Sequence, residues 1–194
     1  MFTSIAIIGR PNVGKSTLFN KLTKTREAIV SDFPGLTKDR NYGYIKLGSI
    51  KSFIIDTGGI GKDESNLSQN ISDQAWMAAN ECNLILFLVD GSENLTSEDF
   101  EILSSLRKLN KPFITLLNKS DKLSKSEALN DISSKGIKDF LDISAEHSRG
   151  LDDLKKLLLQ MLPDKTDDEI IDGKKIAVLG RPNAGKSTFI NNFI

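Results

Sequence analysis

The chain of 194 residues has little cysteine, no long apolar run and no excess of either charge, and each shortage excludes a class of protein. Its single cysteine, Cys82, cannot form an internal disulfide, which fits a reducing compartment and favours a cytoplasmic protein. No run of about 18 apolar residues predicts a membrane span, and the first residues lack the basic segment of a signal peptide. Lysine plus arginine and aspartate plus glutamate number 26 each, so bulk charge predicts neither nucleic-acid nor membrane binding.

What the sequence does contain is an alternation of short apolar segments with segments of helical periodicity. The pattern predicts helices over 14–23, 97–109, 124–135 and 150–162. It predicts strands over 4–9, 42–48, 51–57 and 83–90, a strand followed by a polar turn within 111–121, and a last strand over 137–144. Strands that alternate with helices at these lengths indicate an α/β fold with a mostly parallel six-stranded sheet flanked by helices.

Two nearly identical stretches, "GRPNVGKST" at 9–17 and "GRPNAGKST" at 180–188, indicate a duplicated domain opening. Between them, 163–173 opens on a proline and carries five acids against one lysine, which is typical of an exposed linker. We interpret 1–162 as a complete domain, 163–173 as an acidic linker and 174–194 as the truncated start of a second domain. The second loop, which includes Gly180, Asn183, Gly185, Lys186 and Ser187, is expected to bind nucleotide weakly at most.

The first stretch is a phosphate-binding (Walker A) motif, preceded by a predicted strand and followed by a predicted helix. Its glycines let backbone N–H groups approach phosphate oxygens, and the helix start adds positive charge. We expect Lys15 to reach the β- and γ-phosphates and the Ser16 hydroxyl to bind Mg²⁺. The predicted phosphate-loop residues are Gly9, Arg10, Pro11, Asn12, Val13, Gly14, Lys15, Ser16 and Thr17.

A second motif, Asp56-Thr57-Gly58-Gly59, follows a predicted buried strand. The Asp56 carboxylate can hold Mg²⁺ through its water shell, and the Gly59 N–H can meet the γ-phosphate. Such a turn is common by itself, but about 40 residues after a phosphate loop it indicates the metal side of a nucleotide site. Ile60 comes next and is expected to lie beside the same phosphate.

A third motif, Asn118-Lys119-Ser120-Asp121, predicts the base. The Asp121 carboxylate can accept hydrogen bonds from N1–H and the 2-amino group of guanine, and adenine has neither donor. We expect Asn118 to tie this turn to the phosphate loop and the Lys119 stem to cover the base plane. Ser144 and Ala145, after the last strand, are placed where a backbone N–H could bind guanine O6. The predicted ligands are therefore GTP and GDP.

Together the motifs resemble the small GTPases of the P-loop class. The repeat, with "SDFPGLTKDR" and "DTGGI", is further similar to the bacterial ribosome-assembly GTPase family Der, also called EngA. The resemblance implies a P-loop NTPase with a small-GTPase-like G domain, GTP hydrolysis, Mg²⁺ as cofactor, and the large ribosomal subunit or its RNA as partner. It also implies that Thr37, in a first switch over 26–41, joins Mg²⁺ in the triphosphate state. We expect the chain itself to be monomeric.

The residues beside the γ-phosphate predict slow hydrolysis. Ile60 stands where Ras-like enzymes place a water-orienting glutamine, and its side chain cannot hydrogen-bond to water. The Der resemblance implies that potassium, helped by Asn12, takes the place of an arginine finger. The expected catalytic residues are Lys15, Thr37, Gly59 and Asn12. Arg10 and Arg40 are further candidates to supply positive charge, although an arginine is more often solvated at the surface.

Other interpretations stay open at this point. One is a guanine-nucleotide-dependent binding module with negligible turnover, and another is an Era-like GTPase with a single G domain and an RNA-binding tail. Trp76 and Met77 are expected to pack on the sheet, Cys82 to be buried, and His147 to lie in a loop beside the guanine pocket.

Overall fold

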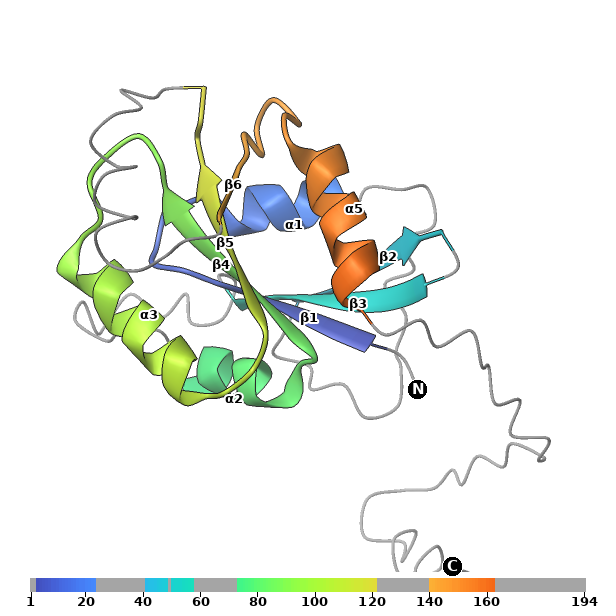
Figure 1. The fold of residues 1–194 in the computed structure, drawn as a ribbon, viewed down its shortest axis with the longest axis horizontal. Coiled ribbons are helices and arrows are strands. Elements are labelled where there is room, and N and C mark those ends of the chain that lie inside the picture. Colours follow the sequence, from blue (N-terminus) through green and yellow to red (C-terminus); the bar gives the residue numbers. More distant parts are fainter. Residues whose placement is uncertain (1–2, 24–40, 49, 58–72, 122–139, 163–194) are drawn as a thin grey trace, which may run out of the picture.

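A six-stranded sheet lies at the centre of the part of the chain that the computed structural model describes, residues 3–23, 41–48, 50–57, 73–121 and 140–162 (Figure 1). In chain order the elements are β1 (Thr3–Ile8), α1 (Lys15–Thr23), β2 (Asn41–Leu47), β3 (Ile50–Asp56), α2 (Asp73–Glu81), β4 (Leu84–Asp90), α3 (Ser97–Lys108), β5 (Phe113–Asn118), β6 (Phe140–Asp142) and α5 (Leu151–Met161). None of the helices within these residues is long and apolar enough to cross a membrane.

The order of the strands is β2-β3-β1-β4-β5-β6, and the pairing of β2 with β3 is antiparallel while the other pairs are parallel. In a parallel sheet the carboxyl ends of neighbouring strands meet at one edge, and ligands bind beyond that edge. Here the register places Ile7 opposite Asp56, and Asp90 opposite Asn118. Polar residues that are far apart in the sequence therefore become neighbours at the ends of their strands.

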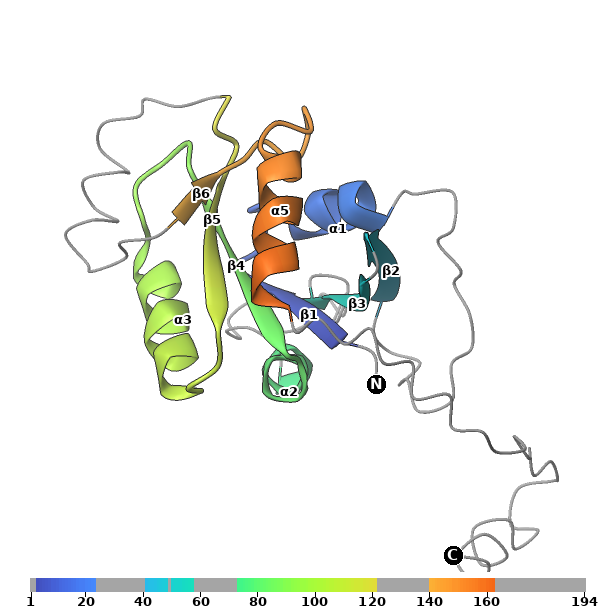
Figure 2. The ribbon, with the colours of Figure 1, turned by 45° about the vertical axis from the view of Figure 1, so that its right-hand side comes forward.

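Helices cover both faces of this sheet. Figure 2 shows α1 and α5 on one face and α2 and α3 on the other, and a separate apolar cluster fills each side. Because both faces are covered, every residue of β4 is buried, which explains its continuous apolar run. The helices contribute Leu18, Leu22, Leu154 and Leu158 to the first cluster and Ala75, Ala78, Ala79, Ile102, Leu103 and Leu106 to the second.

The predicted fold class is confirmed, and most of the predicted elements that lie in the described residues end close to their predicted ends. The sequence predicts the last strand over 137–144, and its described part is Phe140–Asp142. Beyond it, Ser144 pairs with Arg149 across a turn instead of continuing along β5. The predicted helix over 124–135, the linker and the second copy lie outside the described residues.

Helix α2 is an element that the apolar pattern did not predict. Its buried face consists of Ala75, Ala78 and Ala79, followed by Cys82. These side chains are small, so the helical periodicity of apolar residues is weak in the sequence. The expectation that Met77 packs on the sheet is wrong, since this residue is 56% exposed. Trp76 does pack against the cluster, and Cys82 is buried as expected.

Candidate functional site

The loop between β1 and α1 is held against the ends of β4 and β5. A Cβ at Gly9 would lie 2.3 Å from the carbonyl oxygen of Leu88. A Cβ at Gly14 would lie 2.4 Å from Asn118 Nδ2, and its φ of +99° is unfavourable for other residues. Pro11 and Asn12 are exposed at the tip, and Val13 is buried in the core. The two glycines that the motif requires thus sit where the backbone leaves no space for a side chain.

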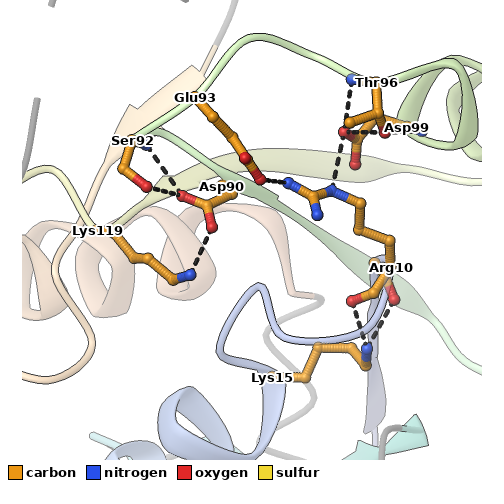
Figure 3. A network of polar contacts seen from close by, with 9 residues as sticks. Arg10, Lys15, Asp90, Ser92, Glu93, Thr96, Asp99 and Lys119 are labelled. Carbon is orange, nitrogen blue, oxygen red and sulfur yellow. Dashed lines mark hydrogen bonds and ion pairs between the residues drawn. The ribbon is translucent and has the colours of Figure 1, made fainter. Parts of the chain in front are cut away.

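Lys15, the first residue of α1, folds back over this loop (Figure 3). Its Nζ donates to the carbonyl oxygens of Gly9 at 2.7 Å and Arg10 at 2.8 Å. Burial lowers the pKa of Lys15, and the negative charge of Asp56 partly opposes this shift. An ammonium group that is shielded from water and placed over the loop is suited to bind an anion there.

The donors predicted for Mg²⁺ lie at the same edge of the sheet. Asp56, the last residue of β3, is buried, and Ser16 is exposed in the first turn of α1. A carboxylate and a hydroxyl are oxygen donors of the kind that Mg²⁺ prefers, and Mg²⁺ usually takes its other ligands from water and substrate phosphates. Among the described residues, there is no group of three or more His, Cys, Asp or Glu that could hold a metal. The donor types therefore fit Mg²⁺.

Thr57 has a structural contact at this edge. Its hydroxyl donates to the carbonyl oxygen of Ile7 at 2.5 Å, so the side chain holds the end of β3 to β1. The other residues predicted around the γ-phosphate lie outside the described residues: Thr37, Arg40, Gly58, Gly59 and Ile60.

Asn118, at the end of β5, joins the phosphate loop to the base-reading turn. Its side chain is buried, its Nδ2 donates to the carbonyl oxygen of Val13 at 2.8 Å, and its Oδ1 accepts from the N–H of Ala145 at 2.9 Å. The predicted tie between this turn and the loop is thus confirmed. Since Asn118 uses the Ala145 N–H, guanine O6 would share that donor.

The carboxylate of Asp121 is oriented by the turn that follows β6. The Ser144 hydroxyl donates to Asp121 Oδ1 at 2.6 Å, and His147 Nε2 lies 3.5 Å from Asp121 Oδ2. The Ser144 N–H donates to the carbonyl oxygen of Arg149, so Ser144 faces the predicted base site through its hydroxyl rather than its amide. His147 lies in the loop beside Asp121, as expected.

The segment between β4 and α3 contributes acids that the motifs do not identify. Asp90 Oδ2 lies 2.5 Å from Lys119 Nζ, and Arg10 forms ion pairs with Glu93 and Asp99 (Figure 3). The expectation that Arg10 is solvated is therefore wrong, since its side chain is only 16% exposed. One signal was available in the sequence: Asp90 ends an apolar strand, and strand ends in such sheets carry functional residues.

Comparison with known proteins agrees with this geometry. Residues 4–119 match the family model described as 50S ribosome-binding GTPase. GTPase Der of Legionella pneumophila (strain Lens) is 48% identical over 198 residues, which cover 100% of this chain and 42% of that protein. GTPase Der of Geotalea daltonii is 45% identical over 195 residues, or 98% of this chain and 44% of that protein. The chain thus spans less than half the length of these relatives.

Solved structures of GTPases share the fold. Era of Aquifex aeolicus, bound to GDP and AlF4−, is 32% identical with a TM-score of 0.67, over 84% of this chain and 58% of that one. Era in complex with MgGDPNP and a segment of 16S ribosomal RNA is 30% identical with a TM-score of 0.66, over 91% and 59%. With a sheet of this order, a phosphate loop tied to a base-reading turn and a family match over most of the site, the chain belongs to the family of 50S ribosome-binding GTPases.

Proposed function

We propose that this chain binds GTP and GDP and hydrolyses GTP, as a switch domain that acts in the assembly of the large ribosomal subunit. The observation that carries the proposal is the double contact of Asn118 with Val13 and Ala145. One buried side chain thereby fixes the spacing between a loop built for phosphates and a turn built for a purine. A nucleotide is a ligand that requires a phosphate-binding loop and a base-binding turn at a fixed separation.

Selection of guanine follows from Asp121. A carboxylate that is held by Ser144 accepts from N1–H and the 2-amino group of guanine, whereas adenine would leave it unpaired. The Lys119 stem covers one face of the base. The Ala145 N–H, which also donates to Asn118 Oδ1, would bind guanine O6, while the Ser144 hydroxyl holds the Asp121 carboxylate.

The phosphate side uses the loop N–H groups, Lys15 and Mg²⁺. Ser16 and Asp56 would hold the metal, and Thr37 would join it when the γ-phosphate is present. Bound Mg²⁺ would neutralise part of the phosphate charge. Gly59, together with Thr57, Gly58 and Ile60, would meet the γ-phosphate.

Hydrolysis is expected to be slow without assistance, because Ile60 cannot orient water through its side chain. Potassium beside Asn12 would supply positive charge instead, and Asn12 is exposed at the loop tip with a φ of 64°. The test is the rate of phosphate release in potassium and in sodium, for the wild type and for Asn12→Ala. Equal rates in the two salts would exclude the potassium role.

The ribosomal role is supported by relatives alone, and the division into 1–162, 163–173 and 174–194 by the repeated motif and the acidic segment between its two copies. The matched relatives are named GTPase Der, and the matched family model is described as ribosome-binding. An RNA-associated Era-like protein is less well supported, since Era structures are 30% and 32% identical against 48% for Der. Cosedimentation with isolated large and small ribosomal subunits, with GDPNP or GDP present, tests the partner. Binding to small subunits only would overturn it.

The nucleotide assignment is tested by calorimetric titration with GTP, GDP and ATP. We expect binding of GTP and GDP and none of ATP. In Asp121→Asn the carboxamide presents a donor toward the 2-amino group of guanine, so the affinity for GDP should fall at least about tenfold. The affinity for xanthosine diphosphate should rise, because its 2-oxygen accepts that donor. Preference for ATP would overturn the proposal. Tight GTP binding without phosphate release in any salt would leave only a guanine-nucleotide-dependent binding module.

A further inference from the structure

The segment from Asp90 to Asp99 joins β4 to α3 and has no part in the nucleotide contacts described so far. It nevertheless holds one cation from each half of the site: Lys119 from the base-reading turn and Arg10 from the phosphate loop (Figure 3). Both contacts bridge long intervals of sequence, and both acids that end the segment are buried. Such a segment can position a charged side chain in each half of the site.

The base side is fixed through Asp90. Its Oδ2 binds Lys119 Nζ, and its Oδ1 accepts from the N–H of Ser92 at 2.9 Å and from the Ser92 hydroxyl at 2.6 Å. The N–H of Gly91 also donates to the carbonyl oxygen of Asn118 at 2.7 Å. Burial alone would raise the pKa of Asp90, but the contacts with Lys119 and Ser92 outweigh it and lower the pKa, so the group is an anion at neutral pH. Lys119 needs this support, because its φ of 63° is unusual for a residue with a side chain.

The phosphate side is fixed through Asp99. Arg10 Nε donates to Asp99 Oδ2 at 3.2 Å, and the guanidinium also pairs with Glu93. The Asp99 carboxylate is itself held in the capping box of α3, where it accepts from the Thr96 N–H at 3.0 Å and the Thr96 hydroxyl at 2.9 Å. Arg10 is thus anchored to the rigid first turn of a helix. Because Arg10 is paired with both Glu93 and Asp99, its guanidinium is held by contacts within the protein.

We propose that segment 90–99 is a carboxylate brace that positions the two halves of the nucleotide site independently: Asp90 positions Lys119 for the base, and Asp99 with Glu93 positions Arg10 and the phosphate loop. The proposal rests on the proposed binding of guanine nucleotides. None of the three acids touches the nucleotide; they are positioning residues. The two arms therefore affect different parts of the ligand.

Whether ligand affinity rises or falls when an acid is removed distinguishes a positioning role from a purely electrostatic one. Removing a negative charge beside a polyanion site strengthens anion binding if charge alone matters. Loss of a brace weakens it, because Lys119 or the phosphate loop must then be ordered when the ligand binds. Asp90→Asn and Asp99→Asn keep the size of the side chain and remove the charge. Asp152→Asn, which removes the charge of an exposed acid on α5, is the matched control.

The experiment measures the affinities of GDP and of inorganic tripolyphosphate, which lacks a base, by competition against a fluorescent GDP analogue. Thermal unfolding confirms that each variant is folded. In Asp90→Asn we expect GDP to bind about tenfold more weakly and tripolyphosphate to bind as in the wild type. In Asp99→Asn we expect the affinities for GDP and tripolyphosphate to fall by the same factor. If Asp99→Asn does not fold, Glu93→Gln tests the same contact with Arg10. Asp152→Asn should change the affinity of neither ligand.

A second measurement needs only GDP. In a Lys119→Met background, Asp90→Asn should have no further effect, because the partner through which it acts is absent. Additive losses, tighter GDP binding in either acid variant, or an equal fall of both ligands in Asp90→Asn would each overturn the brace. Absence of GDP binding by the wild-type chain would instead refute the proposed function.

Discussion

The most informative single substitution in this protein is Asn118→Ala. The buried side chain donates to the Val13 carbonyl oxygen at 2.8 Å and accepts from the Ala145 N–H at 2.9 Å. Alanine removes both contacts and leaves a carbonyl oxygen and an N–H in surroundings where Val13 and Ala145 are fully buried. Each unpaired buried group costs about 1–3 kcal/mol, so the variant should lose about 2–6 kcal/mol of unfolding free energy.

That loss is a large share of the total stability of a domain, which is typically about 5–15 kcal/mol. Urea unfolding of the nucleotide-free protein, followed by circular dichroism, measures it directly. Asn118→Asp is the matched comparison, since it keeps the acceptor for Ala145 and turns a carboxylate toward the Val13 carbonyl. It should be destabilised at neutral pH and should recover in acid, when the protonated carboxyl can donate. A loss of less than about 1 kcal/mol in Asn118→Ala would refute the assigned role of this residue.

Three further outcomes follow from other contacts. Thr57→Val should lower the unfolding free energy by about 1 kcal/mol, because it removes the hydroxyl bonded to Ile7, while Thr57→Ser should not; urea unfolding distinguishes them. The pKa of Asp90 is lowered, so its contribution is present above the unfolded pKa and disappears as pH falls through the folded pKa; the difference in unfolding free energy between wild type and Asp90→Asn should stay constant above the unfolded pKa and shrink as the pH is lowered below it. Burial raises the pKa of the Cys82 thiol, so Ellman's reagent should modify it slowly in the folded protein and rapidly in urea; fast reaction without urea would contradict its burial.

The sequence was sufficient where function depends on residues that are close together in the chain. The phosphate loop could be predicted because the physical requirement and the residues coincide within one turn, and the structure places Gly9 and Gly14 where a Cβ has no space. The tie made by Asn118 could be predicted from the requirement to hold two loops at one distance, and both of its bonds are present.

The sequence was insufficient where partners are chosen by the register of the sheet. Asp90 binds Lys119 because β4 and β5 pair with Asp90 opposite Asn118, and nothing local to either residue indicates that register. Arg10 looks like a surface arginine until α3 places Asp99 beside it. Helix α2 was missed for another reason: alanines bury a face with too little hydrophobicity to produce a clear period.

At the polar edge of the sheet, the buried groups of the turn that follows β5 are bonded within the protein. Asp90 and Asn118 are buried at neighbouring strand ends, where an unpaired polar group is costly. Each has partners within the protein, so the turn that carries Lys119 is already fixed. In the phosphate loop, Lys15 Nζ donates to the carbonyl oxygens of Gly9 and Arg10, and these hydrogen bonds would break if the ammonium group bound phosphate. For the nucleotide binding proposed above, we therefore expect the turn that carries Lys119 to need little rearrangement, whereas the phosphate loop must exchange the contacts of Lys15.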